Sequence, residues 1–236
     1  MRLMTFSLIH SPFLGPSSWR SVGEVLDRNG MRAVTLDLSD ALEAGGRFYE
    51  SFGEIAARQI TAPSILVAHS GAGALVPAIE RHARGLVHGV IFVDALLPHP
   101  GRSWFDTAPT ALAERIRRDA RRGRASPWPS WLPKSVLAEL LPDRRMREDL
   151  INDAPEVSLA FLEELAPDGS AAAALSSRAY LQLSEGYAVE AEQARALGWA
   201  VERVDGHHLS ALTDPAVVAG GIINLALGLA RALPSA

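Results

Sequence analysis

The sequence of 236 residues contains no cysteine, which excludes disulfide bonds, thiolate nucleophiles, zinc–thiolate sites and iron–sulfur clusters. Basic residues do not outnumber acidic ones, with 23 Lys and Arg against 27 Asp and Glu, so we expect no nucleic-acid partner. No apolar run approaches the ~20 residues of a membrane-spanning helix, and we expect no membrane association. A glycine-rich phosphate loop and a metal-ligand spacing are also missing, so the sequence predicts neither a cofactor nor a metal.

What remains has the composition of an ordinary globular chain, with 48% hydrophobic and 21% charged residues. The length suffices for one sizeable core that carries a modest insertion. The first ten residues have too short an apolar run for a signal peptide. We therefore expect a soluble cytoplasmic protein.

Short apolar runs alternate with helix-length segments over the first 100 residues. The expected strands are 6–10, 33–36, 64–68 and 87–93, and the expected helices are 17–29, 46–60 and 71–83. Ser17 or Ser18 is the expected N-cap of the first helix, and Pro77 is expected to kink the third. Strands that alternate with helices predict an α/β fold, in which a mostly parallel central sheet is flanked by helices.

The pattern changes between residues 101 and 175, where no strand is recognisable. Short helices are expected there at 109–122, 135–141, 144–152 and 157–165. Strands then return at 179–183 and 199–204, with helices at 189–197 and 215–229. We expect a core formed by 1–100 and 176–236, with 101–175 as a helical cap insertion over the carboxyl ends of the strands, where ligands of α/β sheets bind.

The strongest chemical signal is Leu66-Val67-Ala68-His69-Ser70-Gly71-Ala72-Gly73. An apolar strand ends at Ser70 and a helix begins directly after it, so the hydroxyl would project above the sheet edge from a strained turn. Such a turn needs small residues two positions before and after the serine, and Ala68 and Ala72 meet this demand. The pattern favours Ser70 as a nucleophile over an incidental serine in a glycine-rich turn.

A serine nucleophile needs a base, and the candidates are His207 and His208. They follow the last expected strand, so their loop returns to the sheet edge that carries Ser70. A nucleophile first and a histidine last is the chain order of the triad in one large hydrolase class.

With these motifs the chain resembles the α/β-hydrolase superfamily over essentially its full length. It is most similar to the group of plant hydroxynitrile lyases and methylesterases with their uncharacterised bacterial relatives. In that group the catalytic histidine precedes a Met-Ala-Met-Leu-like run, and His208-Leu209-Ser210-Ala211-Leu212 matches in this register. The resemblance therefore implies His208 as the base.

The acid of the triad is open between two residues. The resemblance places an aspartate where this chain has Gly186, and Glu185 is one residue away, which reverses its side-chain direction in an extended segment. Asp94 ends the strand that follows the nucleophile helix, and a carboxylate there can reach the imidazole. We favour Asp94, with Glu185 as the alternative.

The oxyanion hole needs two donors, and one is expected to be the backbone N–H of Gly71. The resemblance places the second at Pro12, which has no N–H. Either the Ser11 hydroxyl or the Phe13 N–H substitutes, or the hole is incomplete. One missing donor costs about 2.7–4 kcal/mol of transition-state stabilisation.

Aromatic residues of the insertion are candidate walls of an apolar substrate pocket, above all Trp104, Trp128 and Trp131. His10 ends the first strand and is a further candidate contact, although a buried histidine that binds loop backbone is the favoured interpretation. The leading hypothesis is a serine hydrolase for an ester, thioester or similar acyl bond of a small apolar substrate. The alternatives are a lyase or cyclase that uses the same Ser and His, and a weak or inactive ligand-binding protein. The expected partner is a small-molecule substrate, and a homodimer is left open.

Overall fold

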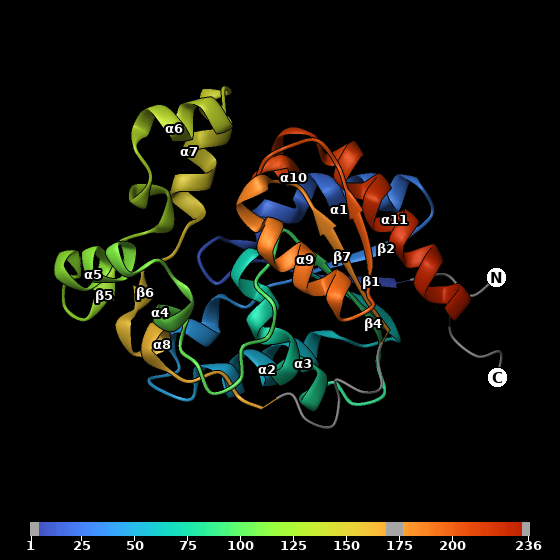
Figure 1. The fold of residues 1–236 in the computed structure, drawn as a ribbon, viewed down its shortest axis with the longest axis horizontal. Helices are drawn as coiled ribbons and strands as arrows, with labels where there is room; N and C mark the ends of the chain where they lie inside the picture. The colour runs from blue at the N-terminus through green and yellow to red at the C-terminus, as the bar shows by residue number, and fades with distance from the viewer. Residues whose placement is uncertain (1–4, 169–176, 233–236) are drawn as a thin grey trace.

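The computed structural model describes residues 5–168 and 177–232, and its centre is one parallel sheet (Figure 1). The six strands lie in the order β2-β1-β3-β4-β7-β8, all parallel to their neighbours. They are β1 (Thr5–Ile9), β2 (Arg32–Leu36), β3 (Ser64–His69), β4 (Val87–Val93), β7 (Ser177–Gln182) and β8 (Ala200–Arg203). The expected mostly parallel α/β sheet is thus confirmed. The order in which successive strands are added to the sheet reverses between β1 and β3.

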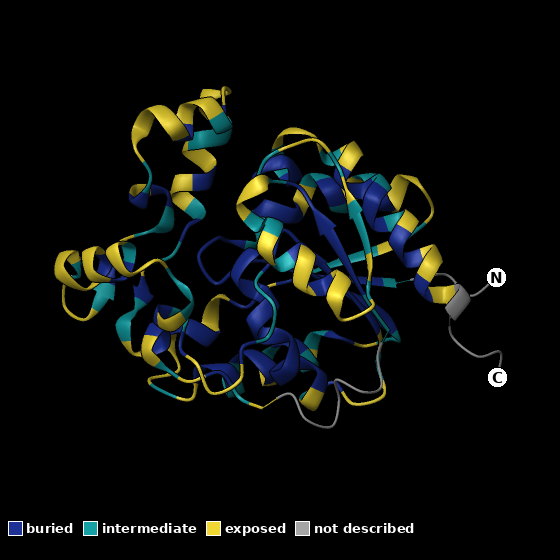
Figure 2. Ribbon diagram, in the orientation of Figure 1, coloured by how far each residue is buried: buried dark blue, intermediate teal, exposed yellow. Residues whose placement is uncertain are grey.

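Helices cover both faces of this sheet. α1 (Arg20–Arg28) and α11 (Pro215–Ala232) lie on one face, and α2 (Phe48–Gln59), α3 (Val76–His82) and α9 (Ala188–Ala196) lie on the other. β3 shows why: Ile65 and Val67 pack into the cluster beneath α1 and α11, whereas Leu66 and Ala68 pack into the cluster beneath α2 and α3. A strand buried on both faces is a continuous apolar run in the sequence, and β3 is buried along its whole length. Figure 2 shows central strands of the sheet in the dark blue of buried residues.

Pro77 does not kink the helix after Ser70. The chain first forms a 3-10 segment, η3 (Ser70–Leu75), and α3 then begins with Pro77 in its first turn. Proline is tolerated at that position because its missing N–H would have no helical partner.

Neither Ser17 nor Ser18 caps the first helix. The chain enters it through a 3-10 turn, η1 (Pro16–Trp19), whose N-cap residue is Gly15. The carboxylate of Asp153, from the insertion, accepts both the Ser17 N–H, at 3.2 Å, and the Ser17 hydroxyl. A Cβ at Gly15 would lie 2.0 Å from Asp153 Oδ2, so only glycine permits this approach. The insertion is therefore bound directly to the segment that follows β1.

The insertion between β4 and β7 is largely helical, as expected. Its helices are α4 (Trp104–Thr107), α5 (Thr110–Asp119), η4 (Trp128–Trp131), α6 (Lys134–Leu140), α7 (Arg144–Asp153) and α8 (Leu159–Glu163). The expectation of no strand was wrong, because β5 (Arg124–Ala125) and β6 (Val157–Ser158) form a small antiparallel pair. Two-residue strands are too short to leave a periodic signal. The expected boundary at 175/176 lies outside the described residues.

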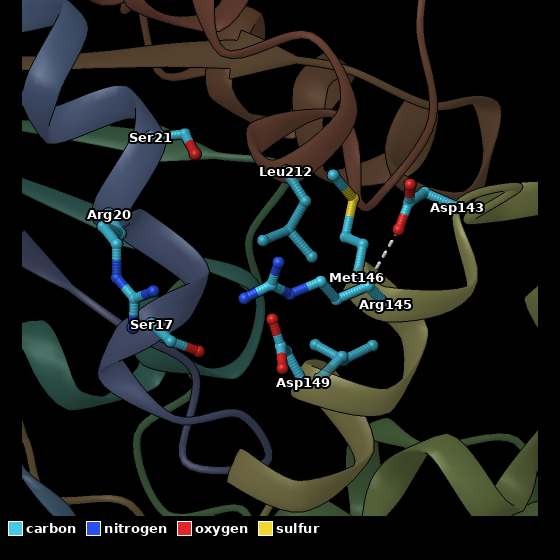
Figure 3. Close-up of a pocket in the computed structure, with 9 residues that line it drawn as sticks. Ser17, Arg20, Ser21, Asp143, Arg145, Met146, Asp149 and Leu212 are labelled. Atoms are coloured by element: carbon cyan, nitrogen blue, oxygen red, sulfur yellow. Dashed lines mark hydrogen bonds between the residues drawn. The ribbon is translucent and has the colours of Figure 1, made fainter.

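Two parts of the insertion meet the core differently. Near its end, the Glu164 carboxylate accepts the N–H groups of Phe48 and Tyr49 at the start of α2, at 2.7 and 3.2 Å. Phe161 packs there against three aromatic rings of α2. By contrast, α7 and the start of α1 are separated by a cavity of about 280 Å³, into which Arg145 points (Figure 3).

The longest helix is α11, and it packs against β7, β8 and α1. In the described part of the chain, no helix combines the length and apolar character needed to cross a membrane.

Candidate active site

Ser70 follows the last residue of β3 with φ = 58°, in the left-handed region that favours glycine. A serine held there marks a strained turn that the surrounding structure enforces. The tightest approach is at Gly73, where a Cβ would lie 1.8 Å from the carbonyl oxygen of Leu96. The Leu96 N–H in turn donates to the Ser70 carbonyl, at 3.0 Å. The strained turn therefore packs against, and hydrogen-bonds to, the segment that follows β4.

Ser70 and His208 meet although they are 138 positions apart in sequence: Ser70 Oγ lies 3.0 Å from His208 Nε2. The other ring nitrogen, Nδ1, lies 2.9 Å from Asp94 Oδ2. An ionised carboxylate can only accept hydrogen bonds, so Nδ1 carries the proton and Nε2 is left to accept the Ser70 hydroxyl. The three side chains form one continuous hydrogen-bonded chain, in the order Ser70, His208, Asp94.

Asp94 directly follows β4, has φ = 43° and is fully buried. Its Oδ1 accepts the N–H groups of Leu183 and Ser184, at 2.9 and 3.0 Å, and its Oδ2 accepts the Ser184 hydroxyl, at 2.6 Å. Burial alone would raise the pKa of Asp94. The hydrogen bond and charge of His208, together with the bonds from Ser184 and Leu183, outweigh burial and lower the pKa below its ordinary value. The carboxylate is thus held ionised and in one orientation.

The His208 ring is stacked between two other rings. His69 lies on one side, at a centroid distance of 4.7 Å, and Tyr187 lies at 4.9 Å with the ring planes 9° apart. His69 Nε2 donates to the His208 carbonyl, at 3.0 Å, and burial followed by the charge of His208 lowers the pKa of His69 to about 3. Tyr187 Oη lies 3.5 Å from Ser70 Oγ, and burial raises the pKa of this phenol.

A pocket of about 420 Å³ opens above Ser70. Its lining residues come from the core and the insertion: Phe13, Ser70, Gly71, Leu96, Trp104, Thr107, Ala108, Pro109, Leu112, Trp128, Trp131, Gly186, Tyr187, Glu190 and His208. Phe13, Trp104 and Trp131 pack edge-to-face or tilted, with centroids 5.2 to 5.7 Å apart. All three tryptophans proposed as pocket walls from the sequence line this space.

Comparison with known proteins gives a fold but no close relative. No protein-family model matches the chain, and no curated protein matches it. Solved structures do match. An extracellular α/β-hydrolase from a Paenibacillus species, described as sharing structural and functional homology with tobacco salicylic acid binding protein 2, aligns with a TM-score of 0.77. It is 18% identical, and the alignment covers 94% of this chain and 98% of that one.

Two further structures extend this comparison. A pyrethroid hydrolase from Sphingobium faniae JZ-2 aligns with a TM-score of 0.73 and 20% identity, over 97% of this chain and 99% of that one. Tomato methylketone synthase I aligns with a TM-score of 0.72 and 12% identity, over 97% and 100% of the two chains. The chain has the α/β-hydrolase fold.

Within this fold the structure separates the two candidate acids. Glu185, in η5 (Glu185–Tyr187), is exposed and pairs with Arg203 Nη1 at 3.4 Å. Asp94, and not Glu185, contacts the His208 ring. Gly186, where the resemblance expects an aspartate, lines the pocket instead.

Beside Gly71, the position where the resemblance expects a second oxyanion donor is Pro12, which has no N–H. Pro12 and the Phe13 ring pack against Gly71, and a Cβ on Gly71 would lie 3.0 Å from the ring and 3.2 Å from Pro12 Cδ. The Phe13 N–H donates to Ser11 Oγ, at 3.3 Å. Ser11 is fully buried and is not among the pocket-lining residues, so the two expected substitute donors contact each other.

His10 lies below the pocket and does not line it. The Leu38 N–H donates to its Nε2, at 3.1 Å, so its Nδ1 carries the proton and donates to the Ser11 carbonyl, at 2.9 Å. Burial lowers the pKa of His10, which keeps the ring neutral. The geometry therefore favours the buried-histidine interpretation, in which His10 joins the end of β1 to the chain after β2.

Sequence reasoning missed His69, Tyr187 and Glu190. His69 directly precedes Ser70, and Tyr187 and Glu190 follow the end of β7, so their positions at the carboxyl edge of the sheet were the available signal. Within the described ranges 5–168 and 177–232, no cluster of three or more His, Asp or Glu side chains could hold a metal ion.

Proposed function

We propose that this protein is a serine hydrolase that cleaves an ester, thioester or similar acyl bond of a small molecule. The observation that carries the proposal is the hydrogen-bonded chain from Ser70 Oγ through His208 to Asp94, with the serine open to a pocket. The residue types, their order in the chain and their contacts match the division of roles in a Ser-His-Asp triad.

In the proposed reaction, Ser70 Oγ attacks the carbonyl carbon and His208 Nε2 takes its proton. The oxyanion that forms is stabilised by the Gly71 N–H. Collapse of this intermediate breaks the bond to the leaving group, which receives the proton from His208 and leaves an acyl-Ser70. Water then attacks the acyl group by the same route in reverse. Asp94 stays ionised throughout and stabilises the imidazolium.

The insertion supplies the pocket walls in this proposal and acts as a cap. Trp104, Trp128 and Trp131 come from it, and their rings favour a largely apolar substrate. The structural neighbours support hydrolysis as the general class, since they include a pyrethroid hydrolase and a polyneuridine aldehyde esterase.

The test is labelling with a fluorophosphonate, which reacts with activated serines. We expect the wild type to be labelled and Ser70→Ala to remain unlabelled. Ser21→Ala is the matched control, because Ser21 lies on α1 outside the catalytic pocket and should leave labelling intact. A folded wild type that is not labelled, or a Ser70→Ala protein labelled equally, contradicts the proposal.

A second candidate is a lyase or cyclase that uses Ser70 and His208 for acid–base chemistry without an acyl-enzyme. Pro12 favours it, because the missing N–H weakens the site most needed for a tetrahedral oxyanion. Ester panels cleaved only at the background rate, with a His208-dependent conversion of another substrate, would favour this candidate. Ligand binding without turnover, unaffected by Ser70→Ala and His208→Ala, would favour a binding protein.

A further inference from the structure

The pocket above Ser70 has an uneven distribution of charge. Of the described residues that line it, Glu190 is the only carboxylate, and none is a lysine or an arginine. Five aromatic rings also line the pocket, those of Phe13, Trp104, Trp128, Trp131 and Tyr187. A neutral apolar substrate would not require a carboxylate here, and burying one carries a cost.

Glu190 is half-buried in the first turn of α9, three residues after Tyr187. In the described part of the chain its carboxylate forms no ion pair and no hydrogen bond to another side chain, although its own backbone amide lies within reach. Burial, and then the charge of Asp94, raise the pKa of Glu190 against the effect of that amide. A cation in the pocket would offset both unfavourable effects.

The aromatic rings supply the second half of a cation site. The negative face of an aromatic ring attracts ammonium groups, and several rings around one carboxylate form the usual surroundings of a bound quaternary ammonium. Two of these rings contact the proposed base: Tyr187 stacks on His208 at 4.9 Å, and the Trp128 centroid lies 6.1 Å from it.

This position also indicates which part of a substrate would carry the charge. His208 must return its proton to the leaving group, so the residues around its ring face the leaving-group side of Ser70. Tyr187 and Trp128 lie there, and Glu190 follows Tyr187 on the same segment.

We propose that the pocket selects substrates with a positively charged leaving group, a protonated amine or quaternary ammonium alcohol, and that Glu190 is the counter-charge. This inference rests on the proposed hydrolase function. It assigns Glu190 a role in specificity and none in the bond-breaking steps.

The test compares two isosteric esters that differ only in charge, butyrylcholine and 3,3-dimethylbutyl butyrate. We expect the wild type to have a kcat/KM at least about fivefold higher for the cationic ester. In Glu190→Gln this ratio should fall to about 1. Glu192→Gln is the matched control, because Glu192 lies exposed on the same helix and pairs with Arg195 at 3.1 Å, and it should keep the wild-type ratio.

Fluorophosphonate labelling of Glu190→Gln shows whether the variant retains a folded site. If both esters are cleaved in a Ser70-dependent way at equal rates, the inference is overturned while the hydrolase proposal stands. If neither ester is cleaved, calorimetry can compare the affinities of the protein for choline and for 3,3-dimethylbutanol, and this comparison tests the cation site. Tighter binding of choline that is lost in Glu190→Gln supports the cation site, and equal binding of the two alcohols overturns it.

Discussion

The two sides of the Ser70 hydroxyl are built with very different numbers of contacts. On the base side, the His208 ring is fixed by Asp94 at one edge and stacked between His69 and Tyr187. On the oxyanion side, Gly71 faces Pro12, which has no N–H to offer, and Phe13, whose N–H donates to Ser11. For the proposed reaction, the contrast predicts that proton transfer is better supported in this site than stabilisation of a developing oxyanion.

The largest expected effect comes from a substitution on the His208 side of Ser70. Asp94→Asn keeps the shape but lets the amide hold the wrong imidazole tautomer, so we expect kcat to fall by about 10⁴-fold. Steady-state kinetics on any ester that the wild type cleaves would measure this. Glu185→Gln is the control, and an equal loss there would reinstate Glu185 as the acid.

The second-largest expected effect comes from a substitution on the Gly71 side of Ser70. Pro12→Ala restores a backbone N–H beside Gly71, and we expect kcat/KM for ester cleavage to rise by about 10²-fold, the lower range of what one oxyanion donor contributes. Thermal unfolding would check that the variant is folded. An unchanged rate in a folded variant would mean that the hole is complete without this donor.

The buried His69 predicts a pH dependence of stability. Its pKa is lowered to about 3 by burial and by the charge of His208, whereas an unfolded histidine titrates near 6.5. Below pH 6.5 the unfolded chain therefore binds a proton that the folded chain does not. This contribution to stability is complete above pH 6.5 and is lost as the pH falls toward 3. Between pH 7 and 5 the loss is about 2 kcal/mol for this one group.

Urea unfolding at pH 7 and pH 5 tests this expectation. In His69→Gln the free energy of unfolding should fall by about 2 kcal/mol less between pH 7 and pH 5 than in the wild type. His88→Gln, which changes an exposed histidine, should show the same fall as the wild type. An identical pH dependence of stability in all three proteins would show that His69 is protonated as readily in the folded chain as in the unfolded chain.

The smallest effect concerns Tyr187. Tyr187→Phe removes the hydroxyl 3.5 Å from Ser70 and keeps the stacking, so we expect kcat to change less than about threefold. Tyr187→Ala also removes the stacking on His208 and should lower kcat by about tenfold. Equal effects of the two substitutions would assign the role to the hydroxyl. A pH–rate profile that shifts only in the alanine variant would identify Tyr187 as a positioning residue.

Much of the fold could be predicted because parallel strands buried on both faces are apolar runs, as in β3 and β4. Ser70, His208 and Asp94 could be proposed because each follows the carboxyl end of a strand. The stacking of Tyr187 on His208 could not be predicted. The direction of the Tyr187 side chain depends on a 3-10 turn and on His208, which lies 21 positions further along the chain. The same holds for Asp153, whose capping of η1 joins segments 136 residues apart.

The position of Asp94 has a consequence for the loop after β7. Ser70 and Asp94, the proposed nucleophile and acid, directly follow the neighbouring strands β3 and β4, and both have a left-handed backbone conformation. If Asp94 is the acid, as proposed, Glu185 to Tyr187 need not supply one, and Gly186 and Tyr187 line the pocket. In the proposed hydrolase, a substitution at Gly186 would therefore reshape the pocket wall without removing a member of the triad.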